Sequence, residues 1–334
     1  MCDTVLQVSL REGKHMNITL QRIAKPTHGE QDWLDLRFWD DKKRKRVSAS
    51  AVAAIYGLHP FVPADKYAAE LLGDVPPSPI PPNPAMERGN RLEPFVLQWA
   101  CDKTGIAYTT PEEMFVAETP EGARMIATLD GLYEDGDERK VLEIKTMSRE
   151  WEGELPDYWR IQGIQQAICA DVDLITWAVF DSTMVLYIYE QKITDAEKQE
   201  HCDAVAKWLT SIDLGITPDG VHWSYETIST RYQKPTGTTV ELPPTASELV
   251  EQLKHVKKEL KAYTEMEDRL KAELCEMIGS NEYATVNGTV VATWKGRTWS
   301  SLDIKAIKAM EPAITEKYSK KVTNRTLLLK GERA

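Results

Sequence analysis

Three residues with complementary chemistry lie close together in the middle third of the chain. Glu143 and Lys145 are two positions apart in an apolar stretch, and Asp130 lies in the strand-like segment that precedes it. Because alternate side chains of a β-strand share one face, Glu143 and Lys145 are expected to point the same way. The Asp-Gly step at 135–136 is typical of a hairpin turn, and such a hairpin would bring Asp130 beside Glu143. The pattern therefore predicts two carboxylates and one ammonium group at one open edge of a sheet.

This trio has a definite chemistry if the two carboxylates converge. Two close carboxylates repel each other unless a cation lies between them, and oxygen ligands suit Mg²⁺ or Mn²⁺. Such an ion polarises a phosphodiester and lowers the pKa of a bound water. Lys145 would orient that water or stabilise the charged phosphate. Metal-dependent phosphodiester hydrolysis is the resulting hypothesis, although Glu and Lys in alternation are also typical of a solvated strand face.

Two predicted helices carry polar side chains that fit the same chemistry. Glu93 lies within the amphipathic helix expected over 85–104, next to its apolar face. Gln162 and Gln166 are four positions apart on the helix expected over 158–170, so they share one face. Neutral amides hold a metal-bound water or a phosphate without competing for the metal. A plain surface position is the alternative for each of these three residues.

Positive charge and helix-capping residues cluster near the N-terminus. Arg37 precedes Ser48 and Ser50, which are candidate N-caps of a small-residue helix over 51–56. A guanidinium beside a helix N-terminus binds a phosphate well. The basic run between Arg37 and Ser48 is expected to contact a DNA backbone, and the alternative is a solvated loop. The candidate contact residues are Lys43, Arg44 and Arg46.

The elements that must position these residues follow the order helix, strand, hairpin, helix, strand, strand. This order predicts an α/β domain with a mixed central sheet flanked by helices. A Pro- and Gly-containing linker follows, then a helix with apolar residues in steps of four and three, opened by a capping box at Thr245–Glu248. That seam predicts a partner helix in a hairpin or coiled coil. The expected organisation is an arm (1–30), the core (31–215), the linker (216–244), the long helix (245–280) and a small αβ piece with a basic tail (281–334).

Composition excludes several classes of protein. The formal net charge is −11, which argues against a protein that simply coats nucleic acid but not against a local basic patch. The five cysteines form no CxxC pair, so neither a disulfide framework nor a zinc ribbon is expected. A reducing, cytoplasmic setting is expected instead. No apolar run is long enough to predict a membrane span.

Taken together and in order, the motifs resemble a known family. W-x-x-x-R, a Ser-capped small-residue helix, G-x-x-x-E-P, D-G, E-x-K and a Gln-rich helix occur between Trp33 and Tyr189. This series is similar to the YqaJ-type viral recombinase, or lambda exonuclease, family of PD-(D/E)XK nucleases. The resemblance implies a restriction-endonuclease-like core, and the C-terminal extension goes beyond the minimal nuclease.

The resemblance also implies a role for each matching residue. Lys145 is similar to the catalytic lysine and Gln162 to the active-site glutamine. The implied metal ligands are Asp130, Glu143, the carbonyl of Ile144 and, through water, Glu93. The implied pocket for a 5′-phosphate consists of Arg37, Ser50 and Thr128. Leu129 departs from the family, which often has Pro there, and the basic run is an insertion.

The activity implied by the resemblance is Mg²⁺- or Mn²⁺-dependent 5′→3′ resection of double-stranded DNA ends during phage recombination in a bacterial host cytoplasm. A ring-shaped homo-oligomer around DNA and a single-strand annealing protein as partner are further implications. Two alternatives stay open: a structure-selective or nicking endonuclease on the same core, and a DNA-binding or assembly protein with an inactive core.

Overall fold

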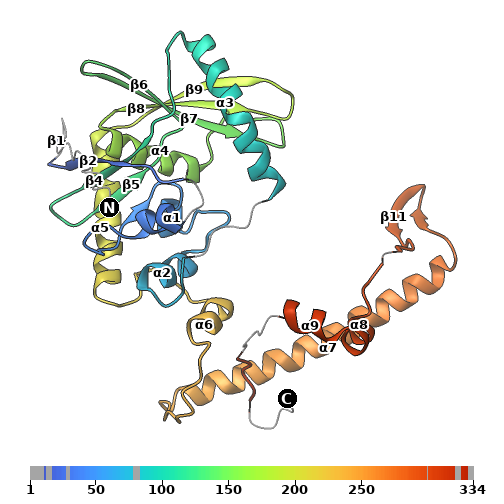
Figure 1. Cartoon of the computed structure of the whole chain (residues 1–334). Coiled ribbons are helices and arrows are strands. Elements are labelled where there is room, and N and C mark those ends of the chain that lie inside the picture. The colour runs from blue at the N-terminus through green and yellow to red at the C-terminus, as the bar shows by residue number, and fades with distance from the viewer. Residues whose placement is uncertain are drawn as a thin grey trace. The chain divides into compact units, whose positions relative to one another are not determined.

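The computed structural model describes residues 11–12, 17–27, 31–77, 83–298, 300–319 and 325–329 (Figure 1). The chain divides into two units, Met1–Arg231 and Tyr232–Ala334, and each is described by itself. The boundary lies inside the segment predicted as a linker, which also contains a helix, α6 (Tyr225–Arg231). Residues 1–10 of the predicted arm lie outside the described residues.

The first unit contains a sheet of five strands in the order β1-β2-β4-β5-β3. All pairs are antiparallel except β3 and β5, which are parallel. Phe115 and Ala117 of β4 lie opposite Ala127 and Met125 of β5, and all four side chains are buried. The bounds are β1 (Arg11–Glu12), β2 (Thr19–Ala24), β3 (Val47–Ser48), β4 (Glu113–Glu118) and β5 (Arg124–Ala127).

A second sheet of four strands has the order β6-β7-β8-β9. β7 and β8 are parallel, whereas the two outer pairs are antiparallel. The turn between β6 and β7 places Gly136 at φ 59°, a left-handed conformation that glycine adopts without strain. The bounds are β6 (Gly131–Asp135), β7 (Glu138–Thr146), β8 (Leu174–Phe180) and β9 (Leu186–Lys192).

The strand-like segment that precedes Glu143 and contains Asp130 is not one continuous strand. The segment is divided between the two sheets, with β5 in the first, β6 in the second and 128–130 between them. The segment contains no Gly, Pro or Asn before Asp130 that would have signalled a break. The division matters because it leaves Asp130 at the point where β6 begins.

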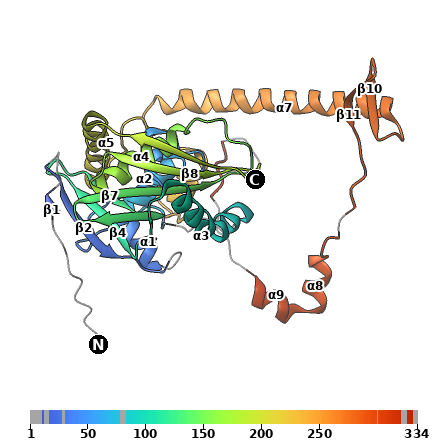
Figure 2. The ribbon, with the colours of Figure 1, turned by 90° about the horizontal axis from the view of Figure 1, so that it is seen from above.

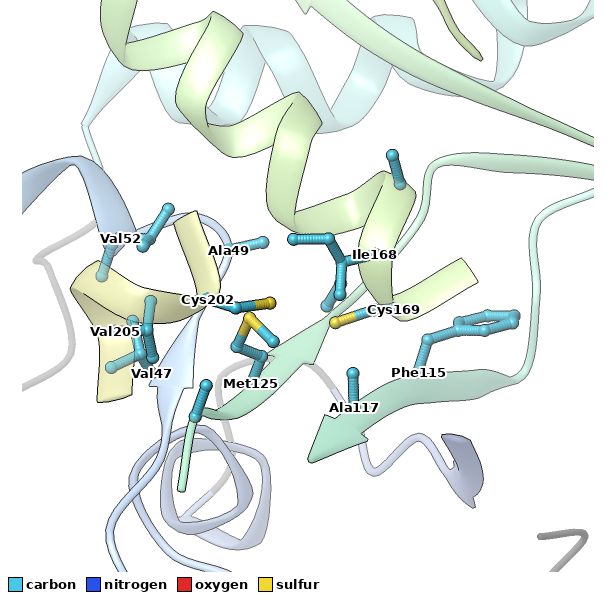
Figure 3. Packing of buried hydrophobic residues seen from close by; sticks show 14 of the residues in the cluster. Val47, Ala49, Val52, Phe115, Ala117, Met125, Ile168, Cys169, Cys202 and Val205 are labelled. Atoms are coloured by element: carbon cyan, nitrogen blue, oxygen red, sulfur yellow. The ribbon is translucent and has the colours of Figure 1, made fainter. Parts of the chain in front are cut away.

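Helices cover both faces of the second sheet. α3 (Pro84–Thr104) packs Val96 and Ala100 against Leu142 and Ile144 of β7. α4 (Asp157–Ala170) belongs to the larger core on the opposite face, together with α5 (Asp195–Asp213) and the first sheet. Figure 3 shows Ile168 and Cys169 of α4 and Cys202 of α5 gathered around Met125 of β5, with Val205 of α5 beside Val47. α4 thus lies between the two sheets and touches both.

The short helices near the N-terminus differ from the prediction. The small-residue helix is a 3₁₀ helix, η1 (Val52–Tyr56), preceded by Ala51 with no side-chain cap. The predicted Ser cap is absent because Arg37 donates hydrogen bonds to the hydroxyls of both Ser48 and Ser50. The remaining helices of this part of the chain are α1 (Gln31–Phe38) and α2 (Ala64–Leu72), both labelled in Figure 1.

The second unit is built on a 33-residue helix, α7 (Ala246–Ile278). The predicted capping box does not form, because Thr245 itself has helical φ and ψ and its side chain caps nothing. Asn287 and Gly288 turn the predicted β-pair with positive φ values of 49° and 79°. Figure 2 shows α7 along its length. The other elements are β10 (Tyr283–Val286), β11 (Thr289–Thr293), α8 (Ile304–Met310) and α9 (Pro312–Tyr318).

Within the described residues, no helix has both the length and the apolar character needed to cross a membrane.

Candidate active site

Asp130 and Glu143 meet at the edge where β6 begins beside β7. Gly131 is the first residue of β6 and pairs with Leu142, so Asp130 and Glu143 are the next residues along this register. Oδ2 of Asp130 accepts the backbone N–H of Ile144 at 2.8 Å. A Cβ atom on Gly131 would lie 3.0 Å from Cβ of Leu142, so glycine permits this close approach. The Glu143 side chain also lies inside the protein, since this residue is only 3% exposed.

Lys145 lies against Glu143 on the same face of β7. Its Nζ donates to Oε1 of Glu143 at 2.7 Å and to Oε1 of Gln162 at 3.2 Å. The ammonium group also lies 5.8 Å from the ring centres of both Trp159 and Trp177. A lysine held between a carboxylate and two aromatic rings is oriented before any substrate arrives.

Both oxygens of Glu143 receive a hydrogen bond from α4. Gln162 donates from Nε2 to Oε1 at 2.6 Å, and Gln166 donates from Nε2 to Oε2 at 2.5 Å. Gln166 also reaches the carbonyl of Thr128 at 3.2 Å. The structure therefore brings the two predicted glutamines onto one carboxylate, and Thr128 next to them.

Gln165 has a different role from its neighbours. Its Nε2 donates to the carbonyls of Val47 at 2.9 Å and Ile126 at 3.1 Å, where β3 and β5 run side by side. Its side-chain oxygen faces Nε2 of His201 at 3.2 Å. The helical spacing already indicates that Gln165 lies on another face than Gln162 and Gln166. The spacing does not indicate that Gln165 donates to buried backbone carbonyls.

The electrostatics of the cluster favour an added positive charge. Burial and the neighbouring Glu143 carboxylate raise the pKa of Asp130 well above its usual range. Burial lowers the pKa of Lys145, but the carboxylates of Glu143 and Asp130 outweigh it and raise that pKa overall. Burial also raises the pKa of Glu93, and the charge on Glu143 adds to this effect. A cation between these acids would return Asp130 to its ionised form.

The donor set fits a hard divalent cation. Because the N–H and C=O of one strand residue point toward the same neighbour, the Ile144 carbonyl faces the Asp130 side, beyond the last β6–β7 pair. Oε1 of Gln166 is buried and has no hydrogen-bond partner within the described part of the protein. Among the described residues, no three or more His, Cys, Asp or Glu side chains form a closed metal cluster. Two carboxylates and a carbonyl suit Mg²⁺, which keeps several of its waters.

Arg37 and two serines form a second polar site. Nη2 of Arg37 donates to Oγ of Ser48 at 3.2 Å and to Oγ of Ser50, and the guanidinium lies 4.4 Å from the Trp33 ring centre. Burial lowers the pKa of Arg37, a guanidinium that stays charged in proteins, so this site holds a positive charge in a poorly solvated place. The hydroxyls and the guanidinium together are suited to an anion.

His59 lies next to this site, and no motif in the sequence indicates its role. Its Nε2 lies 3.1 Å from the carbonyl oxygen of Ser50. Burial lowers the pKa of His59, and the positive charges of Arg37 and Lys145 lower it further. The His59 ring also lies 6.3 Å from the ring of Tyr158 on α4, so one imidazole contacts both the Ser50 loop and the helix that carries Gln162 and Gln166.

The basic run does not join the cluster. The Arg44 guanidinium is paired with Asp40 at 2.7 Å and with Glu118 at 2.6 Å. Arg46 is 4% exposed and donates to the carbonyl of Trp39, whereas Lys43 is exposed. These three residues line a cavity of about 580 Å³ between α1 and the first sheet, and none of the carboxylate-cluster residues lines it.

The comparison with known families identifies the middle of the chain. Residues 38–173 match the family model of the YqaJ-like viral recombinase domain. The predicted family resemblance is confirmed. This YqaJ-like domain contains Asp130, Glu143, Lys145 and the α4 glutamines. Its mixed sheets flanked by helices confirm the predicted α/β core.

Solved structures similar to this chain include three exonucleases. An alkaline exonuclease from Laribacter hongkongensis is 22% identical, with 55% of this chain and 93% of that chain covered and a TM-score of 0.43. A phage related exonuclease from Haemophilus somnus 129PT is 15% identical, with 51% and 96% covered and a TM-score of 0.34. A putative exonuclease from Eubacterium rectale is 14% identical, with 61% and 92% covered and a TM-score of 0.35.

No TM-score among these reaches 0.5, so these likenesses do not decide the activity of this chain. A search of curated proteins finds no match.

Proposed function

We propose that this protein is a divalent-metal-dependent DNA exonuclease that resects double-stranded ends from 5′ to 3′. The match to the YqaJ-like viral recombinase domain supports a nuclease role. The observation that carries the proposal is the buried Asp130–Glu143–Lys145 cluster, which lies beside a separate anion site at Arg37. One site suits the scissile phosphate and the other suits the phosphate at the strand end.

Each residue of the cluster has a defined task. Asp130, Glu143 and the Ile144 carbonyl would hold Mg²⁺ or Mn²⁺, with Glu93 adding negative charge nearby. When bound, the ion supplies a hydroxide nucleophile at neutral pH and neutralises charge on the phosphate. Lys145 stabilises the added negative charge of the transition state. Gln162 and Gln166 fix the rotamer of Glu143 through its two oxygens.

The second site supports an exonuclease over an endonuclease. Arg37, Ser48 and Ser50 offer a guanidinium and two hydroxyls to a terminal 5′-phosphate, and Thr128 is the further residue that the family resemblance assigns to this pocket. A strand end that occupies this site presents its next phosphodiester to the cluster, which gives 5′→3′ polarity. An endonuclease has no terminal phosphate to place there.

Other parts of the proposal follow from the family resemblance alone. These are a homo-oligomeric ring around DNA, work with a single-strand annealing protein, and a place in the cytoplasm of a bacterial host. Lys43 is the exposed member of the basic run and is the side chain we assign to the DNA backbone. Arg44 and Arg46 would first have to leave their present partners.

The proposed activity is tested on a linear duplex with a 5′-phosphate. The parent protein is expected to release nucleotides only when Mg²⁺ or Mn²⁺ is added. Asp130→Asn and Lys145→Met are each expected to lose about 1000-fold or more in rate. Lys140→Met is the matched control, since Lys140 is on the same strand and pairs with Glu138 outside the cluster. Lys145→Met should still shift the duplex in a gel.

The polarity and the substrate end need a second experiment. Linear duplexes with and without a 5′-phosphate are compared with closed circular DNA. An exonuclease prefers the phosphorylated end, leaves the circle intact, and loses its preference in Arg37→Gln. Cleavage of the circle would instead support the endonuclease, and DNA binding without any metal-dependent digestion would support an inactive core.

A further inference from the structure

The C-terminal end of the chain differs in charge from the rest. Residues 281–334 carry ten lysines and arginines against five acids, a net charge of +5, whereas the whole chain carries −11. The other 280 residues therefore carry −16. The match to the YqaJ-like domain ends at residue 173 and assigns no role to this end. Positive charge gathered at one end of an acidic protein attracts a polyanion to that end.

The two-stranded ribbon of β10 and β11 begins a stretch that has cations but no acids. Figure 2 shows this ribbon after α7. From Tyr283 to Leu302 the sequence contains no Asp or Glu, and the two cations of the stretch, Lys295 and Arg297, are both exposed. The stretch itself therefore offers its cations no carboxylate, and both are open to an external anion.

Each face of the ribbon presents one exposed aromatic ring. Tyr283 is 53% exposed and Trp294 is 51% exposed. Tyr283 pairs with Thr293, and the N–H of Trp294 donates to the carbonyl of Glu282 at 2.9 Å, so the pairing continues by one residue. Because successive residues of a strand point to opposite faces, the two rings lie on opposite faces of the ribbon.

Lys295 lies on the same face as Tyr283. Its ammonium group is 4.3 Å from the ring centre and also donates to the phenolic oxygen. A cation beside an exposed ring is the combination that binds a nucleotide, because the phosphate takes the charge and the base packs on the ring. The ribbon thus combines both groups in one exposed place.

We propose that the ribbon β10–β11, with Lys295 and Arg297, is a binding surface for single-stranded DNA whose bases pack on Tyr283 and Trp294. The bases of a duplex are already stacked and paired, whereas unpaired bases have open faces for a ring. The choice of DNA rests on the proposed function, since resection from 5′ to 3′ leaves a 3′ single strand as product. The surface itself goes beyond that function, because it lies outside the residues that cut.

Charge favours a nucleic acid over a protein as the occupant. The apolar seam of α7 is exposed as well, but charged residues on that helix pair with each other, as Lys254 does with Glu251 and Lys271 with Glu267. A surface with both signs of charge suits another protein helix. The acid-free stretch 283–302 suits a polyanion instead.

The binding test uses the full chain with Lys145→Met and no added metal, so that the DNA stays intact. The probes are a fluorescent single-stranded circle and a closed circular duplex, neither of which offers a 5′ end to Arg37. The single-stranded circle should bind more tightly. Tyr283→Ala and Trp294→Ala should each weaken its binding about 10-fold, whereas a Phe at either position should retain it. Val290→Ser is the control, since Val290 lies on the same ribbon and is 55% exposed.

The salt dependence of binding tests the two cations. On a single strand, each neutralised phosphate adds about 0.7 to the slope of log affinity against log salt. Combining Lys295→Gln with Arg297→Gln should therefore lower this slope by about 1.4. Combining Lys261→Gln with Lys271→Gln, two exposed lysines of α7, should leave it unchanged.

Three results would overturn the proposal. These are an unchanged salt slope in the ribbon double variant, equal binding of the single-stranded circle by the parent and both alanine variants, and tighter binding of the closed duplex than of the single-stranded circle.

The two proposals fail in distinguishable ways. If the parent protein shows no metal-dependent digestion of a linear duplex, the proposed function fails and the ribbon is still tested on the circles. If the parent digests DNA normally and the ribbon variants bind the single-stranded circle as the parent does, only the assignment of the ribbon fails.

Discussion

Helices α4 and α7 distribute polarity in opposite ways. α4 buries polar side chains completely, with Gln165 and Gln166 both 0% exposed. α7 exposes apolar side chains along its heptad seam, with Leu260 64% and Met277 82% exposed. The difference shows that the sequence pattern indicates which face of a helix is polar and which is apolar. The neighbouring elements decide which of the two faces is buried.

The neighbours of α4 explain its buried amides. This helix lies between two sheets, and Gln165 and Gln166 each donate to a buried carboxylate or backbone carbonyl. A buried polar group without a partner costs about 1–3 kcal/mol, so these matches hold the helix in one register. The seam of α7 meets no comparable partner within the described residues of its unit, and the predicted partner helix stays a prediction.

The largest effect is expected where α4 touches the cluster. Gln166→Leu removes the donor to Oε2 of Glu143 and should reduce the rate of metal-dependent digestion about 10- to 100-fold. The apparent affinity for Mg²⁺ should fall as well, measured from the dependence of rate on ion concentration. Gln199→Leu on the exposed start of α5 is the control. An unchanged Mg²⁺ dependence would mean that α4 does not orient the acid.

Gln165 is expected to affect stability instead of catalysis. Gln165→Leu leaves the carbonyls of Val47 and Ile126 without their side-chain donor, and the free energy of unfolding should fall by about 2 kcal/mol. Urea denaturation measures this, and activity per folded molecule should persist. A lower activity of Gln165→Leu without a loss of stability would contradict the assignment of a structural role to Gln165.

Asp130 is expected to destabilise the metal-free protein. Because burial and Glu143 raise its folded-state pKa, its contribution favours folding at low pH and is lost as the pH rises through that pKa. Asp130→Asn should therefore unfold about 1 kcal/mol less readily than the parent at pH 8 without metal, and this gain should vanish below about pH 4. Thermal unfolding at several pH values gives the measurement. A variant less stable than the parent at pH 8 would show that the ionised acid is well compensated.

The smallest effect is expected on α7. Leu260→Ser should change the free energy of unfolding by less than about 0.5 kcal/mol if its seam is solvated, as its exposure indicates. A loss of several kcal/mol that depends on protein concentration would instead reveal a partner helix from another copy. That outcome would remove the contrast between the two helices.

The meeting of the carboxylates and the lysine could be predicted because the information for it is local. Asp130, Glu143 and Lys145 depend on one hairpin and on strand alternation, and the observed register of β6 and β7 places them together. The long helices α3, α4, α5 and α7 also follow from sustained periodicity and from glycines such as Gly105, which ends α3 at φ 70°.

The missed features depend on contacts between distant segments. No local signal divides β5 from β6, because sheet membership is decided by which strands pair. Ser48 and Ser50 look like caps, yet Arg37 takes their hydroxyls from eleven and thirteen positions away. His59 looks like a loop residue until its ring is seen to bind Ser50 and the turn after it.

The short link at 128–130 has a mechanical consequence. Ser48 is anchored to β5 through its pairing with Ile126, whereas Glu143 belongs to the sheet that starts three residues after Thr128. The short covalent link between the two sheets therefore limits how far apart the anion site and the carboxylate cluster can lie. If the proposed function holds, the separation of the two sites sets the length of the released fragment. Lengthening the link by a single residue would then change the size of the fragment released at each cut.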